Sequence, residues 1–359
     1  MLDTVKLCVS YDHVQIDDFS RFNINPQYIQ RNGTCYRAPT IEEANEGIPY
    51  IEIKVIPQNG EPPKKELRIF FSVPKLIFQN NYTECEDSDF QLVIDTLKDK
   101  LEQIWVHVSK SDLENAYVSR IDYGKNILLD TRTKTIIKAL KSLPQSKHKS
   151  VDENDFQNHG SQIRIQTQYT DYKIYDKFYD IQKNDKSTIV TDKGSVQLID
   201  FLEANNIRNI IRLEYSLKSV REIRNTFDKC GINVYPSFRN IFNSNIARII
   251  NLYSFDSNIS KHKSFSFMQQ TRYGTIIDKC YMANKSIYKT LAIIGVRALM
   301  TRENGIQSRT ERYSNTTLTI VSLQKEIDDL DLDKNAIAKA LKHIREELDN
   351  NKPIRDGAV

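Results

Sequence analysis

The stretch YIEIKVIPQNGEPPKKELRIFFSV, residues 50–73, carries the clearest fold signal in the sequence. Apolar and polar residues alternate through residues 50–56 and again through 66–73, which is the pattern of half-buried β-strands. The segment between them, NGEPPKK, contains the Gly and Pro residues of a turn. These residues therefore predict a β-hairpin, and an antiparallel sheet around it.

The rest of the chain extends this pattern. Further strands are predicted at the N-terminus and at residues 117–123, 163–167, 172–180 and 209–216. Apolar residues at helical spacing predict helices at 87–108, 133–143, 196–205, 220–230, 237–252, 276–301 and 334–350. The polar segment 142–162 is expected to be a surface loop.

Strands dominate before residue 230 and helices after it. We therefore predict an α+β fold with two parts. Residues 1–230 would form a catalytic domain with a central antiparallel sheet that carries the active site. Residues 231–359 would form a mainly helical region that binds DNA or a partner, and the helix at 334–350 is a candidate dimer surface.

The composition is that of an ordinary globular protein. The 359 residues include 51 Lys and Arg against 47 Asp and Glu, a formal net charge of +4. No apolar run approaches the roughly 18 residues of a membrane span. The five cysteines form no C-x-x-C pair, and the motifs of P-loop, Rossmann, zinc-protease and serine-hydrolase sites are absent. We expect a cytoplasmic protein with free thiols and no membrane contact.

Three predicted strands carry polar or charged residues two positions apart. Side chains two apart lie on one face of a strand. The pairs are Arg120 with Asp122, Tyr175 with Lys177, and Arg212 with Glu214. If the three strands are neighbours, one face combines groups suited to phosphodiester chemistry. Carboxylates bind a divalent cation, a tyrosine attacks phosphorus, and Lys and Arg neutralise developing charge. A solvated strand face with cross-strand ion pairs is the alternative.

In order and spacing, these three motifs resemble the replication initiator family typified by the gene II proteins of filamentous phages. The segment SVPKLIFQNNYTE, residues 72–84, is similar to a further motif of that family. The resemblance implies a nickase that cuts one strand at an origin through a covalent 5′-phosphotyrosine and later rejoins it. Such an enzyme starts rolling-circle replication of a phage or plasmid in the cytoplasm of a bacterial host. Its partners would be single-stranded or supercoiled origin DNA, a host helicase and a polymerase.

The resemblance also assigns roles to residues. It implies that Tyr175 is the nucleophile and Lys177 its partner, and that Asp122 and Glu214 hold Mg²⁺ or Mn²⁺. Residues expected to contact DNA are Arg120, Arg212, Lys75 and Asn81. The sequence lacks the His-hydrophobe-His motif of many such initiators, so the remaining metal ligands stay unassigned. Tyr179, on the same face of a continuous predicted strand as Tyr175, is either a second catalytic tyrosine or a packing residue.

Positive charge is concentrated late in the predicted catalytic domain. Residues 208–248 contain eight Lys and Arg against three Asp and Glu. Lys218, Arg221 and Arg224 fall at helical spacing on one stripe, which predicts phosphate contacts or a solvated helix face. The segment 261–273 adds basic and aromatic residues that could stack on unpaired bases.

Two other functions remain open on the sequence alone. One is a non-catalytic protein that binds an origin and recruits host replication enzymes. The other is an RNA-processing nuclease, which seldom needs a tyrosine nucleophile. Convergence of Tyr175, Asp122 and Glu214 favours the nickase, whereas a Tyr175 buried under a helix favours the non-catalytic protein.

Overall fold

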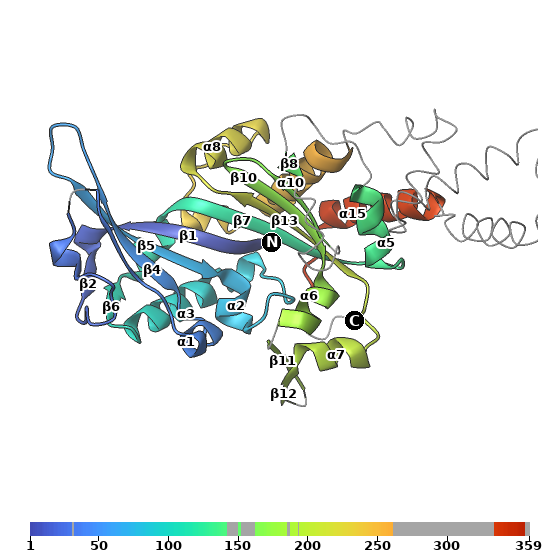
Figure 1. Ribbon diagram of the computed structural model, residues 1–359, viewed down its shortest axis with the longest axis horizontal. Coiled ribbons are helices and arrows are strands. Elements are labelled where there is room, and N and C mark those ends of the chain that lie inside the picture. The colour runs from blue at the N-terminus through green and yellow to red at the C-terminus, as the bar shows by residue number, and fades with distance from the viewer. Residues whose placement is uncertain are drawn as a thin grey trace, which may run out of the picture.

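The computed structural model describes residues 1–30, 32–141, 150–151, 162–184, 187–192, 194–260 and 334–355. These residues form a mixed α+β structure around a nine-stranded sheet (Figure 1). The strand order is β3-β4-β5-β1-β7-β13-β10-β9-β8, and every neighbouring pair is antiparallel. The expected α+β class with a large antiparallel sheet is therefore confirmed.

The main sheet consists of strands with these bounds: β1 Leu2–Ser10, β3 Thr34–Arg37, β4 Tyr50–Ile56, β5 Lys64–Ser72, β7 Tyr117–Leu128, β8 Ser150–Val151, β9 Gln162–Gln166, β10 Thr170–Asp176 and β13 Ile210–Leu217. Two small sheets pair β2 Val14–Ile16 with β6 Val106–Val108, and β11 Thr188–Thr191 with β12 Gly194–Gln197. The hairpin predicted at 50–73 is β4 and β5, with Ile51 opposite Ile69.

The described α-helices are α1 Ile41–Asn45, α2 Val73–Phe78, α3 Phe90–Glu102, α4 Lys110–Asn115, α5 Thr133–Lys141, α6 Lys177–Asn184, α7 Leu198–Ala204, α8 Val220–Lys229, α9 Phe238–Ile241, α10 Ser244–Phe255 and α15 Lys334–Asn350. Within the described residues, every helix is too short or too polar to cross a bilayer. The cysteines in this part of the chain, Cys8, Cys35, Cys85 and Cys230, are free thiols.

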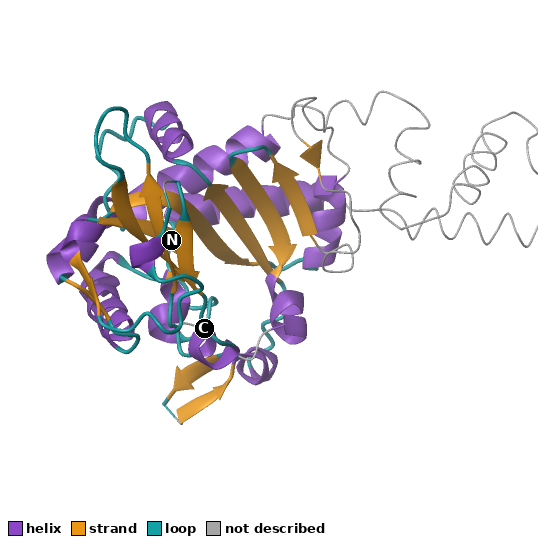
Figure 2. Cartoon of the chain, turned by 60° about the vertical axis from the view of Figure 1, so that its left-hand side comes forward, coloured by secondary structure: helices purple, strands orange, loops and turns teal. Residues whose placement is uncertain are grey.

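The two faces of the sheet differ in chemistry. One face contributes alternate apolar residues to the main core, among them Leu7, Ile69 and Leu213. Helices α3, α8 and α10 bury their apolar stripes in this core, and Figure 2 shows helices lying along the sheet. The opposite face of the same strands carries polar side chains, because successive side chains of a strand alternate in direction.

Helices from both predicted parts share this core. It includes Ile250 of α10 and Ile344 of α15 as well as residues of α3 and β1. A second, smaller core lies under α6, α7 and the β11–β12 pair, around Ile181, Ile189 and Leu202. The boundary near residue 230 stays a prediction.

Several predicted elements differ from the observed ones, and three of them lie outside the three motif strands. The helix expected at 87–108 begins as an α-helix at Phe90 and ends at Glu102, because Trp105 adopts a left-handed backbone (φ 61°) before strand β6. The helix expected at 237–252 is split into α9 and α10. The Asn243 side chain caps α10 by accepting a 3.0 Å hydrogen bond from Ile246 N. Part of the loop expected at 142–162 is strand β8.

Two further expectations lie outside the described residues. They are the helix at 276–301 and the basic and aromatic segment at 261–273.

Candidate functional site

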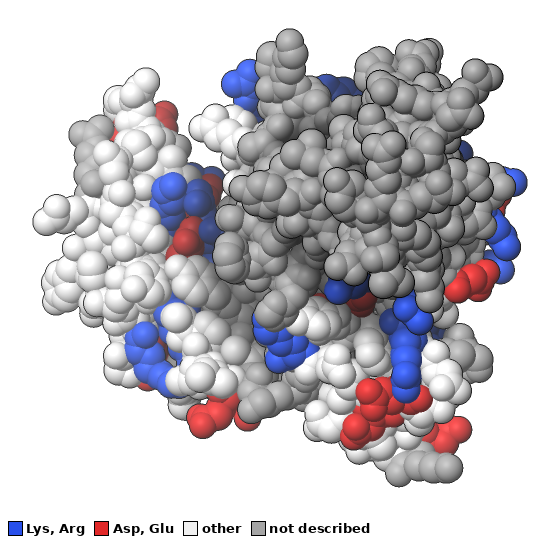
Figure 3. Space-filling view, turned by 45° about the vertical axis from the view of Figure 1, so that its right-hand side comes forward, with Lys and Arg blue, Asp and Glu red and all other residues white. Residues whose placement is uncertain are grey.

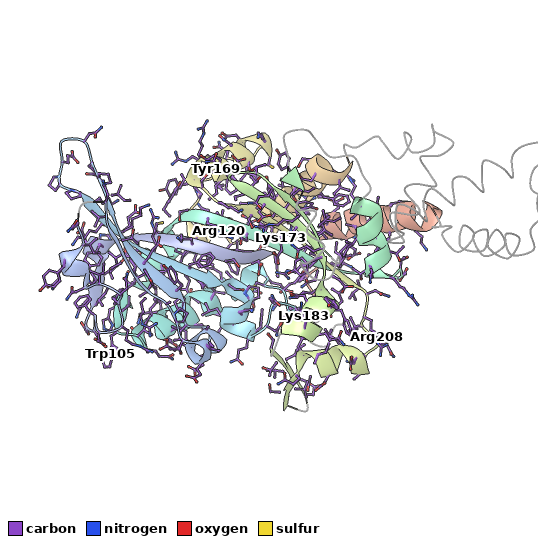
Figure 4. The ribbon with its side chains drawn as sticks, viewed as in Figure 1. Trp105, Arg120, Tyr169, Lys173, Lys183 and Arg208 are labelled. Atoms are coloured by element: carbon purple, nitrogen blue, oxygen red, sulfur yellow. The ribbon has the colours of Figure 1, made fainter. Side chains whose placement is uncertain are left out.

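The three motif strands are neighbours in the middle of the sheet, in the order β7, β13, β10. Tyr175 lies opposite Arg212, which lies opposite Asn126 of β7. Two residues along, Lys173 lies opposite Glu214, and Asp122 lies opposite Ser216. Within each strand these positions are separated by an even number of residues, and across the strands they are paired. Their side chains therefore lie on the same face of the sheet, the polar face. Figure 4 labels Lys173 of this set, and also Arg120 of β7, which lies two positions before Asp122.

The Glu214 carboxylate joins the central groups of this face. Its Oε1 accepts a 2.6 Å hydrogen bond from the Tyr175 hydroxyl and one of 2.8 Å from Arg212 Nε. Its Oε2 lies 3.4 Å from Lys173 Nζ. Burial acts to raise the pKa of Glu214, but the charges of Arg212 and Lys173 and the Tyr175 hydrogen bond outweigh it and hold that pKa at about 2. Glu214 is therefore ionised at neutral pH.

Tyr175 is buried in this arrangement, with 7% of its surface exposed. Burial, and then the charge of Glu214, raise the pKa of its hydroxyl well above the ordinary 10. The ammonium of Lys177 lies 5.9 Å from the centre of the Tyr175 ring. Lys177 is fully buried, and its Nζ donates to Asp180 at 2.9 Å. The phenol is thus in its protonated form, between a carboxylate and a buried ammonium.

Arg212 is fully buried and orients its neighbours. Its guanidinium donates to Asn81 O at 2.8 Å and to Asn126 Oδ1 at 3.0 Å, and it lies 3.0 Å from Asp3 Oδ2. Gly124 makes this placement possible. A Cβ at that position would lie 3.0 Å from Arg212 Nη2 and 3.4 Å from Cζ.

Asp122 lies beside this group rather than inside it. Its carboxylate accepts hydrogen bonds from Arg120 Nε at 3.1 Å and from Arg120 Nη2 at 2.9 Å. Burial raises the pKa of Asp122, and the Arg120 pair opposes that shift. Glu214 and Asp122 are diagonal neighbours on adjacent strands, a relation that puts side chains about 7–8 Å apart.

The side chains of the site do not fit a divalent cation as they stand. Both predicted ligands are already neutralised, Asp122 by Arg120 and Glu214 by Arg212 and Lys173. Among the described residues, no group of three or more His, Cys, Asp or Glu is arranged to hold a metal ion. A cation would have to displace an arginine from a carboxylate.

The expected position of Tyr179 is wrong. The strand predicted at 172–180 ends at Asp176, and Tyr179 lies on helix α6. The Asp176 carboxylate causes the change, because Oδ1 accepts a 3.0 Å hydrogen bond from Tyr179 N, as a helix N-cap does. The two-residue period that related Lys177 and Tyr179 to Tyr175 therefore stops at Asp176, and the expected strand position of Lys177 is wrong as well, because Lys177 is the first residue of α6.

The remaining predicted residues lie around this centre. Lys75 is exposed on α2, and Asn81 contributes its backbone oxygen to Arg212. Lys218 is not on a helical stripe with Arg221 and Arg224, because α8 begins at Val220. Instead, its Nζ lies 3.3 Å from Asp171 on the polar face. Arg221 and Arg224 are exposed on α8, on the side of the sheet that carries the helices.

The loop that contains Asn81 is held by buried polar residues. The Asn80 amide donates to Phe78 O and Thr188 O, and its oxygen accepts from Tyr82 N and Thr83 N. Glu84 accepts from Lys125 Nζ at 2.6 Å and from Asn126 N at 2.7 Å. Asn81 Oδ1 is buried and has no hydrogen-bond partner among the residues that the structure describes.

Sequence reasoning missed three residues of the site. Lys173 lies two positions before Tyr175, so the alternation that selected Tyr175 also selects Lys173. Asn126 continues the alternation of Arg120 and Asp122. No sequence pattern points to Asp3, because its ion pair with Arg212 depends on the pairing of β1 with β7.

No protein-family model matches the chain, and no curated protein or solved structure matches it.

Proposed function

We propose that this protein is a replication initiator of the rolling-circle type, which nicks one DNA strand through a covalent link to Tyr175. The observation that carries the proposal is the hydrogen bond from the Tyr175 hydroxyl to Glu214, with Arg212, Lys173 and Lys177 around the pair. An ionised carboxylate 2.6 Å from a phenol is positioned to accept its proton. Lys173, the partly exposed cation of the group, suits a phosphate that gains negative charge during transfer.

The proposed step is an in-line displacement. The Tyr175 oxygen forms a bond to phosphorus while the bond from phosphorus to the 3′ oxygen breaks. The phenol proton passes by way of Glu214 to water, and water protonates the departing 3′ oxygen, so Glu214 is ionised again at the end of the step. Rejoining is the reverse reaction. A divalent cation belongs to the proposal only through the family resemblance, and no part of this step depends on it.

An adduct assay tests this proposal. The wild-type protein and Tyr175→Phe are incubated with single-stranded origin DNA of the element that encodes the protein, with Mn²⁺ or with EDTA. We expect a covalent protein–DNA band on a denaturing gel for the wild type and none for Tyr175→Phe. Tyr179→Phe, which alters a tyrosine on α6, is the matched control and should keep the band. An adduct that Tyr175→Phe retains would disprove the assigned nucleophile.

One observation favours a second function. Tyr175 is 7% exposed, so a phosphate reaches its hydroxyl only after neighbouring side chains move. This favours the alternative of a non-catalytic protein that binds an origin and recruits host replication enzymes. Origin binding with no adduct under any of these conditions would establish that alternative.

A further inference from the structure

Three aromatic side chains form a patch on the polar face of the sheet, away from Tyr175. They are Tyr36 of β3, Tyr50 of β4 and Phe70 of β5, which we call the aromatic patch. The Tyr36 and Tyr50 rings are stacked, with centroids 6.0 Å apart and planes 26° apart. Tyr50 lies directly opposite Phe70 in the strand register. The patch therefore runs across three neighbouring strands.

The patch is not part of the hydrophobic core. The opposite face of β4 and β5 supplies the core through residues such as Ile51, Ile53 and Ile69. Tyr36 is 43% exposed, and Tyr50 and Phe70 are half-buried. Aromatic rings in such positions are available to a partner.

Positive side chains border the aromatic patch. The Arg120 guanidinium lies 5.2 Å from the centre of the Phe70 ring. Lys6 lies 3.1 Å from Glu52, and Arg68 lies 3.3 Å from Glu52 and 3.4 Å from Glu66, so both cations are paired with carboxylates on this face. In Figure 3, a group of Lys and Arg side chains lies beside Asp and Glu side chains on one side of the molecule.

A planar ring beside a cation matches the chemistry of an unpaired nucleotide. The base stacks on the ring, and its phosphate pairs with Lys or Arg. Duplex DNA does not match, because its bases are already stacked on one another.

We propose that the aromatic patch binds unpaired bases of single-stranded DNA, with Lys6, Arg68 and Arg120 next to the phosphates. This inference rests on the proposed function and adds a second contact region for the same DNA strand. The patch and Tyr175 lie on one face of the sheet, and β5 and β10 are four strand spacings apart, or about 20 Å. Arg120 joins the two regions because it contacts both Phe70 and Asp122.

Fluorescence anisotropy with a labelled oligothymidine of about twelve nucleotides tests the proposal. The test variant combines Tyr36→Leu with Tyr50→Leu, which removes two rings and keeps apolar side chains. We expect its Kd to rise by about fivefold to a hundredfold, the range for loss of base stacking. The pair Tyr36→Phe and Tyr50→Phe keeps the rings and should bind as the wild type does.

Trp105→Leu is the matched control. Trp105 is an aromatic residue with 57% exposure, at the turn between α3 and β6 and far from Arg120 in Figure 4. This variant should bind like the wild type. Equal binding by the Leu pair and the wild type would overturn the proposal, as would wild-type binding to a duplex as tight as to the single strand. Loss of a dimer in the Leu pair with unchanged DNA binding would make the patch a protein interface and also overturn it.

The adduct assay separates this proposal from the proposed function. If the wild type forms the Tyr175 adduct and the Leu pair binds DNA normally, only the aromatic patch is disproved. If the wild type forms no adduct and the Leu pair loses binding to the oligothymidine, the nickase is disproved and the patch stands.

Discussion

Tyr175 and Glu214 lie on adjacent strands, β10 and β13, and their side chains are joined by a 2.6 Å hydrogen bond. The bond connects a phenol whose pKa is raised by burial with a carboxylate whose pKa is held at about 2. The two shifts fit together, because the ionised carboxylate needs a donor and the protonated phenol supplies one. A proton can pass from Tyr175 to Glu214 only when the phenolate is stabilised, for example when a DNA phosphate lies next to the Tyr175 oxygen and a bond to phosphorus begins to form.

The low pKa of Glu214 predicts a loss of stability in acid. A carboxyl whose folded pKa is depressed contributes stability above its unfolded pKa of 4.5 and loses it as the pH falls toward the folded value of about 2. Urea denaturation of the wild type should therefore show a falling free energy of unfolding through this window. Glu214→Gln should be less stable at pH 7 and show a shallower decline. Equal slopes for the two proteins would disprove the assigned shift.

Gly124 is predicted to be needed for the placement of Arg212. In Gly124→Ala, the new Cβ would crowd the guanidinium at 3.0–3.4 Å and weaken its contacts to Asp3 and Asn126. We expect a loss of about 1–3 kcal/mol in the free energy of unfolding, measured with urea. A double-mutant cycle with Arg212→Lys supplies the control, because a shorter cation removes the crowding. Purely additive effects would show that Arg212 is not the crowded group.

The buried pair of Lys125 and Glu84 is predicted to hold the Asn81 loop against β7. Both side chains are 1% exposed, and their charged atoms are 2.6 Å apart. Lys125→Met leaves a buried carboxylate without its cation and should cost about 3–5 kcal/mol of unfolding free energy. Combining Lys125→Met with Glu84→Gln should recover part of that loss, because no net charge then stays buried. A double variant less stable than the single one would contradict this account.

Competition between Arg120 and a cation for Asp122 gives a test of metal binding. If Asp122 is a ligand, Arg120→Gln should tighten Mn²⁺ binding severalfold, because the carboxylate loses its bidentate partner. Electron paramagnetic resonance of free Mn²⁺ measures the affinity without reference to activity. Asp122→Asn is the control and should weaken binding. Unchanged affinity in both variants would exclude Asp122 as a ligand.

Part of the site could be predicted from the sequence, because it depends on local geometry. The alternation in residues 117–123 and 209–216 predicts strands, and a strand places side chains two apart on one face whatever surrounds it. This is why Arg120 with Asp122, and Arg212 with Glu214, were paired correctly. The same rule failed for Lys177 and Tyr179 relative to Tyr175, because the Asp176 cap starts a helix at Lys177.

The sequence by itself determined the antiparallel hairpin of β4 and β5 and the residues that share a face. Only the tertiary structure decided that β13 lies between β7 and β10, which puts Tyr175 opposite Arg212 and within hydrogen-bond distance of Glu214. It also decided that Arg120 neutralises Asp122 and that Asn81, 131 residues from Arg212, accepts its hydrogen bond. The physical reason is the distance along the chain over which each effect acts. Backbone alternation acts between neighbours in the chain, whereas strand order, burial and ion pairing depend on residues brought together only by folding.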